Sequence, residues 1–195
     1  MRILGPVLTL LATLASTSAA QQGPRIIVIG MESRLDLPAA IWDAIRQVDS
    51  TFVPYTEADF LPFMRHQLPT DSSTLYAVLG DVNADQHLDL MVYGQGRRDA
   101  RLLGVVSSGN GYRAYELVRS PAVDPRRQAY HMGPEHYEYG LARSLVRFPP
   151  GRIVTAMVPD TLDLRTPAAQ LRLAEVGGVL YYWHQGAFRS FDLGD

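Results

Sequence analysis

The chain has 195 residues, of which 47% are hydrophobic and 19% charged, and its formal net charge is −2 at pH 7. This length allows one domain with its own hydrophobic core. Neither sign of charge forms a long block, which argues against an extended basic surface for nucleic acid. The sequence has no cysteine, so a disulfide cannot stabilise the fold, and a core, a metal ion or a partner must do so.

The first twenty residues have the pattern of a secretory signal peptide. Arg2 supplies a positive charge, residues 4–14 are mainly apolar, and residues 18–20 are small, which predicts cleavage before Gln21. The apolar run is shorter than the roughly 20 residues that span a bilayer. We therefore expect a small secreted or periplasmic protein of bacterial type, with a signal peptide at 1–20, a single domain at 21–195, and no stable membrane insertion after cleavage.

The N-terminal part of this domain predicts one strand and one or two helices. An apolar run at residues 25–30 is typical of a short strand. Residues 37–48 predict a helix, because apolar side chains recur along one face and Asp36 can cap its start. A second helix of one or two turns is expected from Thr56, since Asp59 follows at capping spacing and a proline soon after should end it.

From about residue 75 the apolar pattern changes to the period of two that is typical of strands. Residues 76–79 and 88–93 predict strands on either side of an acidic loop. Residues 101–107 and 112–118 flank an Asn-Gly pair, which favours a tight hairpin.

The C-terminal half predicts an antiparallel meander. Residues 120–139 are polar and rich in proline, and we expect a long connection there. Four further strands are expected at 152–158, 170–176, 179–184 and 187–192. Helices early and strands late predict an α+β domain, with one or two N-terminal helices packed on a mainly antiparallel sheet.

Side chains with oxygen donors recur through the acidic loop at residues 81–89. Asp81, Asn83, Asp85 and Asp89 occupy its first, third, fifth and ninth positions, and His87 would add its backbone carbonyl at the seventh. Calcium takes six to eight oxygen ligands and is bound by loops with this order of donors. The carboxylates also repel one another unless a cation or hydrogen-bond donors satisfy them. We expect calcium at these five residues; the alternative is a turn whose side chains bond only to their own backbone.

This DxNxDxxxD string resembles the calcium loop of FG-GAP and VCBS-type extracellular proteins, in which the loop joins two strands. The match covers about a dozen residues in one copy, so it implies a calcium loop but not the propeller that several copies build. The string also resembles the start of an EF-hand or dockerin loop. It departs from that pattern at Gln86, where glycine is usual, and at Val92, where an acidic ligand is usual. Because the loop lacks this bidentate acidic ligand, we expect weak binding, with a dissociation constant of about 10⁻⁵ to 10⁻³ M.

A second polar cluster offers an enzymatic alternative. His131, Glu135, His136 and Glu138 could bind zinc or perform acid-base chemistry, although their spacing matches no zinc signature. No serine or glycine-rich loop has the setting of a hydrolase nucleophile or a phosphate site. An exported hydrolase that uses this cluster is the alternative to a structural or recognition role.

A third possibility is a surface that binds a glycan or a peptide. Aromatic side chains gather near the C-terminus, and alternation along strands should send half of them to the core. An arginine group could contact an acidic partner or line a solvated strand edge. The aromatic residues are Tyr181, Tyr182, Trp183, Phe188 and Phe191, and the arginines are Arg97, Arg98 and Arg101.

Overall fold

The computed structural model describes residues 23–109, 111–154, 161–174 and 176–194. The expected signal peptide lies outside these residues. Within them, no helix has the length and apolar character needed to cross a bilayer.

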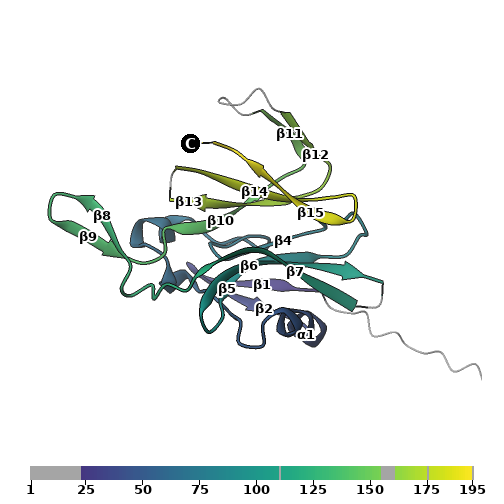
Figure 1. The fold of residues 1–195 in the computed structure, drawn as a ribbon, viewed down its shortest axis with the longest axis horizontal. Coiled ribbons are helices and arrows are strands. Elements are labelled where there is room, and N and C mark those ends of the chain that lie inside the picture. The colour runs from purple at the N-terminus through teal and green to yellow at the C-terminus, as the bar shows by residue number, and fades with distance from the viewer. Residues whose placement is uncertain (1–22, 110, 155–160, 175, 195) are drawn as a thin grey trace, which may run out of the picture.

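Two antiparallel sheets form the body of the protein, one above the other (Figure 1). The first sheet has the order β3-β5-β6-β7, and β4 pairs with the same strand β5. The second has the order β10-β13-β14-β15. Their strands are β3 (Val53–Pro54), β4 (Ala77–Gly80), β5 (Asp89–Gln95), β6 (Asp99–Ser108), β7 (Gly111–Pro121), β10 (Arg143–Phe148), β13 (Ala168–Leu173), β14 (Val176–His184) and β15 (Ala187–Asp192).

Three separate two-stranded hairpins and one α-helix complete the described part of the chain. The hairpins are β1 (Arg25–Ile29) with β2 (Glu32–Asp36), β8 (Ala129–Gly133) with β9 (His136–Tyr139), and β11 (Gly151–Val154) with β12 (Thr161–Leu164). The helix is α1 (Ala39–Val48), and two 3₁₀ turns follow at Glu57–Asp59 and Pro62–His66.

The expected α+β class is wrong, because strands account for 55% of the described residues and helices for 11%. One α-helix lies against the outer face of the first sheet, on β6 and β7 (Figure 1). The second expected helix is replaced by the two 3₁₀ turns. Thr56 and Asp59 form the predicted capping box, but Pro62 starts a new turn and prevents a continuous helix.

The first helix itself begins later than the sequence indicates. Pro38 occupies its N-cap without a side-chain hydrogen bond. Asp36, the expected cap, instead ends β2 and pairs with Arg25 at 2.6 Å. Ile41 and Ile45 are buried, as the apolar spacing predicts.

The long connection expected at 120–139 is also wrong. Strand β7 continues to Pro121, and β8 and β9 then pair as a hairpin that projects from the body (Figure 1). Proline and polar composition concealed the hairpin, because its strands are exposed and lack a regular apolar face.

Several strand predictions are confirmed. Strands β6 and β7 form a tight hairpin in which Ser108 pairs with Gly111, and Gly109 has a positive φ of 57°. Asn110 lies outside the described residues. Strands β13, β14 and β15 form the expected meander. The expected strand at 152–158 is described only as far as Val154, as β11, and it pairs with β12 in a separate hairpin and does not join the meander.

The core lies on both faces of the first sheet. Residues 89–94 of β5 are all buried, since α1 and neighbouring segments cover one face and the second sheet covers the other. Between the sheets, the rings of Tyr115, Trp183 and Phe188 contact one another edge to face. The centroids of the three pairs lie 5.0–5.8 Å apart. Gly104 of β6 leaves room for the Phe188 ring. These aromatics therefore hold the sheets together.

We expect Gly104→Ala to weaken this packing. A Cβ at residue 104 would lie 2.5 Å from two atoms of the Phe188 ring, so the β14–β15 hairpin must shift. The free energy of unfolding should fall by roughly 1–3 kcal/mol, as measured by urea denaturation. Gly111→Ala is the matched control, because a Cβ there meets nothing within 4 Å. Equal effects of the two substitutions would contradict the proposed contact.

Candidate functional site

The acidic loop joins β4 to β5, between the paired residues Gly80 and Asp89. The prediction that it lies between two strands is therefore confirmed. Antiparallel pairing brings the two ends of the loop together, so residues 81–88 form a compact turn at one end of the first sheet.

Three side chains of this loop fold back onto its own backbone. Asp81 Oδ1 and Asn83 Oδ1 accept hydrogen bonds from the same Asp85 amide, at 3.0 and 3.1 Å. Asp81 Oδ2 accepts from the Gln86 amide at 2.9 Å, and Asp85 Oδ1 accepts from the His87 amide at 2.9 Å. Two oxygens that share one donor must lie close together, so the loop gathers its first and third donors on one side.

Asp89 is fully buried and binds backbone amides from two directions. Its Oδ2 accepts from Val82 at 2.8 Å and from Asn83 at 3.3 Å, while its Oδ1 accepts from Ser107 of β6 at 2.7 Å. This carboxylate therefore fixes the start of the loop to the neighbouring strand. If this carboxylate were removed, the buried amides that donate to it would have no acceptor.

Ser107 is a site residue that the sequence did not reveal. Its hydroxyl donates to Asp85 Oδ2, and its carbonyl accepts from Asn83 Nδ2 at 3.0 Å. It lies far along the chain from the loop, and only the pairing of β5 with β6 brings it there. The sequence predicted a strand at residues 101–107, and Ser107 could have been placed beside the loop if the register of this strand against β5 had been known.

The two inner carboxylates differ in their acidity. Burial raises the pKa of Asp89 to about 6, although three backbone amides oppose this shift. Burial also acts to raise the pKa of Asp85, but hydrogen bonds from Ser107, His87 and Asn83 lower it below its usual value. The loop thus stabilises the charge on Asp85 better than the charge on Asp89.

Two residues of the loop adopt the left-handed conformation. Ala84 has φ of 63° and Gln86 has φ of 69°. Gln86 stands at the sixth position, where the related loops use glycine for a sharp turn. The loop therefore takes the expected turn without glycine, at a cost of roughly 1–2 kcal/mol for each left-handed residue.

The structure brings Asp81, Asn83, Asp85 and Asp89 into one loop, but not into a finished ligand shell. The described residues contain no group of three or more His, Cys, Asp or Glu side chains placed to hold a metal ion. Asp85 Oδ2 faces the Ser107 hydroxyl, and Asp89 faces the loop amides. The oxygen donors suit calcium in kind, and the Asp85 carboxylate would have to turn from Ser107 to join the others.

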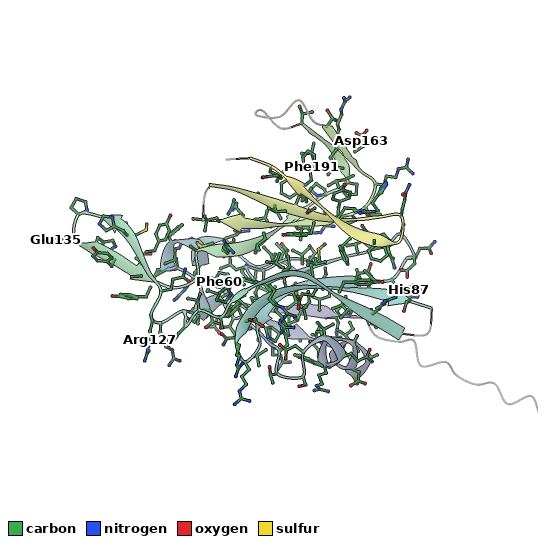
Figure 2. All side chains as sticks on the ribbon, in the orientation of Figure 1. Phe60, His87, Arg127, Glu135, Asp163 and Phe191 are labelled. Carbon is green, nitrogen blue, oxygen red and sulfur yellow. The ribbon has the colours of Figure 1, made fainter. Side chains whose placement is uncertain are left out.

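The histidine cluster lies elsewhere, on the projecting hairpin. His131, Glu135 and His136 are exposed, and Glu135 lies at the tip, far from His87 of the acidic loop (Figure 2). The His131 ring packs on Tyr137 at 5.1 Å, and His136 Nε2 lies 3.6 Å from Glu138. An exposed hairpin does not enclose a substrate, so this arrangement does not favour the hydrolase.

The other two candidate surfaces are largely used by the fold. Trp183 and Phe188 pack between the sheets, and Tyr182 and Phe191 pack in a second small core. Arg101 is almost buried and contacts three carboxylates. These belong to Asp49 at 3.4 Å, Asp99 at 3.2 Å and Glu116 at 2.9 Å, so Arg101 is not part of an open basic patch.

No family model matches this chain, and neither the curated proteins nor the solved structures include a significant match to it.

The left-handed residues allow a test of the loop geometry. We expect Ala84→Gly to raise the free energy of unfolding by about 0.5 kcal/mol, because the relief of left-handed strain exceeds the entropy cost of glycine. Ala122→Gly makes the same chemical change at an exposed position without a positive φ. It should lower the free energy of unfolding by roughly 0.5–1 kcal/mol. Urea denaturation of both variants provides the measurement. A loss of stability in Ala84→Gly as large as in Ala122→Gly would contradict the loop geometry.

The raised pKa of Asp89 predicts that the free energy of unfolding in EDTA depends on pH. Its pKa is about 6 in the fold and about 3.9 when unfolded, so its contribution is fully present below pH ~4 and is lost as the pH rises through ~6. The pKa of Asp85 is lowered, so the protonation of Asp85 changes stability only at pH values below this range.

Urea denaturation between pH 4.5 and 7 should test this, with Asp89→Asn as the reference that cannot titrate. The stability difference between the natural protein and Asp89→Asn should shrink as the pH rises. A difference that stays constant would show that Asp89 does not carry the effect.

Proposed function

We propose that the protein is an exported calcium-binding domain, in which one calcium ion rigidifies the loop between β4 and β5. The ligands would be side-chain oxygens of Asp81, Asn83, Asp85 and Asp89 with the carbonyl of His87. The role is structural or in recognition of a protein or glycan partner, rather than catalytic.

One observation carries this proposal. The Asp81 and Asn83 oxygens share the Asp85 amide, within a turn that Gln86 closes in a left-handed conformation. Side chains that fold back in this way gather two oxygen donors at the start of the loop, as a hard cation requires. A turn without an ion would make the same hydrogen bonds, and the response to calcium distinguishes the two.

The charge of the loop adds support. Asp81, Asp85 and Asp89 have no arginine partner among the described residues, and His87 is the one basic side chain within ion-pair distance of Asp85, at 3.4 Å. A divalent cation would offset this repulsion. It would also lower the cost of keeping Asp89 ionised in the core.

Export is proposed from the N-terminal sequence pattern. Millimolar calcium outside the cell is enough to load a loop of modest affinity, and a protein without cysteine gains from such a stabilising ion. At a free calcium concentration tenfold above the dissociation constant, binding would add about 1.4 kcal/mol to the free energy of unfolding.

Thermal unfolding of the purified protein in EDTA, millimolar calcium and millimolar magnesium tests the proposal. We expect calcium to raise the midpoint by a few degrees and magnesium to raise it less. In the variant Asp81→Ala/Asp85→Ala, calcium should no longer raise the thermal midpoint above its value in EDTA, even if that value itself differs from the natural protein's.

A matched control separates binding from general loss of charge. Asp71→Ala/Asp124→Ala likewise removes two carboxylates, both of them exposed, and at Asp124 a similar turn in which the Arg126 amide donates to the side chain at 3.0 Å. This variant should keep the full calcium increment. The proposal fails if calcium leaves the natural protein unchanged, or if both double variants respond alike.

A further inference from the structure

A cavity of about 330 Å³ lies at the other end of the sheets from the acidic loop. It opens where the ends of β6 and β7 meet β10 and β13, close to Phe60, which Figure 2 places away from His87. Its size is at the lower end of the range for small-molecule sites.

The walls of this cavity are fixed by backbone hydrogen bonds. Leu141 donates to the Asp59 carbonyl at 2.8 Å, and its own carbonyl accepts from Leu61 at 3.1 Å. On the opposite side, the Tyr55 amide donates to the Tyr93 carbonyl at 3.1 Å. The cavity is therefore preformed and needs no large rearrangement to admit a ligand.

Apolar groups dominate the inner surface. Ala100, Leu141 and Ala142 are each at most 4% exposed and line the inside, and Leu173, which is 43% exposed, lies at the edge. Such a lining favours an apolar ligand body, because each buried methylene contributes about 0.8 kcal/mol.

Two tyrosines line the cavity beside these apolar groups. The rings of Tyr55 and Tyr93 meet edge to face with centroids 5.0 Å apart. The Tyr55 hydroxyl is buried without a hydrogen-bond partner and has no surface open to the cavity, so Tyr55 contributes its ring and not its hydroxyl. Burial raises the pKa of both hydroxyls, so both keep their protons at neutral pH.

Arg143 gives the cavity its charge. Among the described residues that line it, Arg143 is the one charged side chain, and no carboxylate shares the lining. Arg143 is exposed, and it makes no ion pair with another described residue within 4.0 Å. An arginine at the edge of an apolar cavity suits a carboxylate ligand with an apolar chain.

We infer that this cavity binds a small monocarboxylate, with its apolar chain among Ala100, Leu141 and Leu173 and its carboxylate beside Arg143 at the edge. The site does not depend on calcium. It would give the domain a small-molecule ligand in addition to the ion.

Titration of the isotope-labelled protein with straight-chain monocarboxylates of four to ten carbons, followed by NMR in EDTA, tests this inference. Affinity should rise about fourfold for each methylene until the chain fills the cavity. The primary amides of the same acids should bind at least about tenfold more weakly, since they lack the charge. Shift changes should map to residues around Tyr93, Leu141 and Arg143.

Single substitutions assign the roles of the polar groups. Arg143→Gln should weaken carboxylate binding about tenfold and leave amide binding unchanged. Arg152→Gln, at an exposed position on β11, is the matched control and should leave both unchanged. Tyr55→Phe should leave binding unchanged and should not lower the thermal midpoint of the free protein, because it removes a hydroxyl that has no partner and does not open on the cavity.

The inference fails if the acids cause no saturable shift changes up to 10 mM, or if acid and amide bind equally. It also fails if Arg143→Gln and Arg152→Gln behave alike. Because the titrations are done in EDTA, these results are independent of the calcium test.

Discussion

The buried carboxylate of Asp89 is the contact on which the loop and its sheet depend. Its oxygens accept hydrogen bonds from Val82 and Asn83 on one side and from Ser107 on the other. It thereby joins the start of the loop to the end of β6. Asp89 is fully buried, and because a carboxylate in the core is costly to ionise, burial raises its pKa to about 6.

Strand β5 connects this end of the protein to the other. Asp89 begins the strand beside the acidic loop, and Tyr93 lies four residues further on in the wall of the apolar cavity. Four residues of extended chain cover about 13 Å. The two proposed sites therefore share one strand, which is buried from Asp89 to Gly94.

The sequence was most informative where local pattern decides the structure. The two strands around the acidic loop, the hairpin with Gly109 at its turn and the C-terminal meander all follow from short-range alternation and turn residues. The capping box at Thr56 was also correctly predicted. Gln86, which stands where glycine is usual, adopts the left-handed conformation that glycine would allow.

The sequence failed where distant segments decide the structure. The second helix expected from Thr56 became two 3₁₀ turns, and the exposed hairpin at β8 and β9 has no apolar alternation to reveal it. Ser107 joins the loop only through the register of β5 and β6. Tyr55 and Arg143 meet at the cavity through contacts between segments far apart in the chain, which no local pattern encodes.

The order of pairing in the two sheets also has a consequence for folding. Strands β4 to β7 are consecutive in the chain and joined by short turns, so this sheet can form from local contacts. Strand β10 must instead pair with β13 across the intervening β11–β12 segment, and it bears the higher entropy of closing a longer loop. The acidic loop thus belongs to the part of the molecule that forms early, and the cavity is completed only when the second sheet docks.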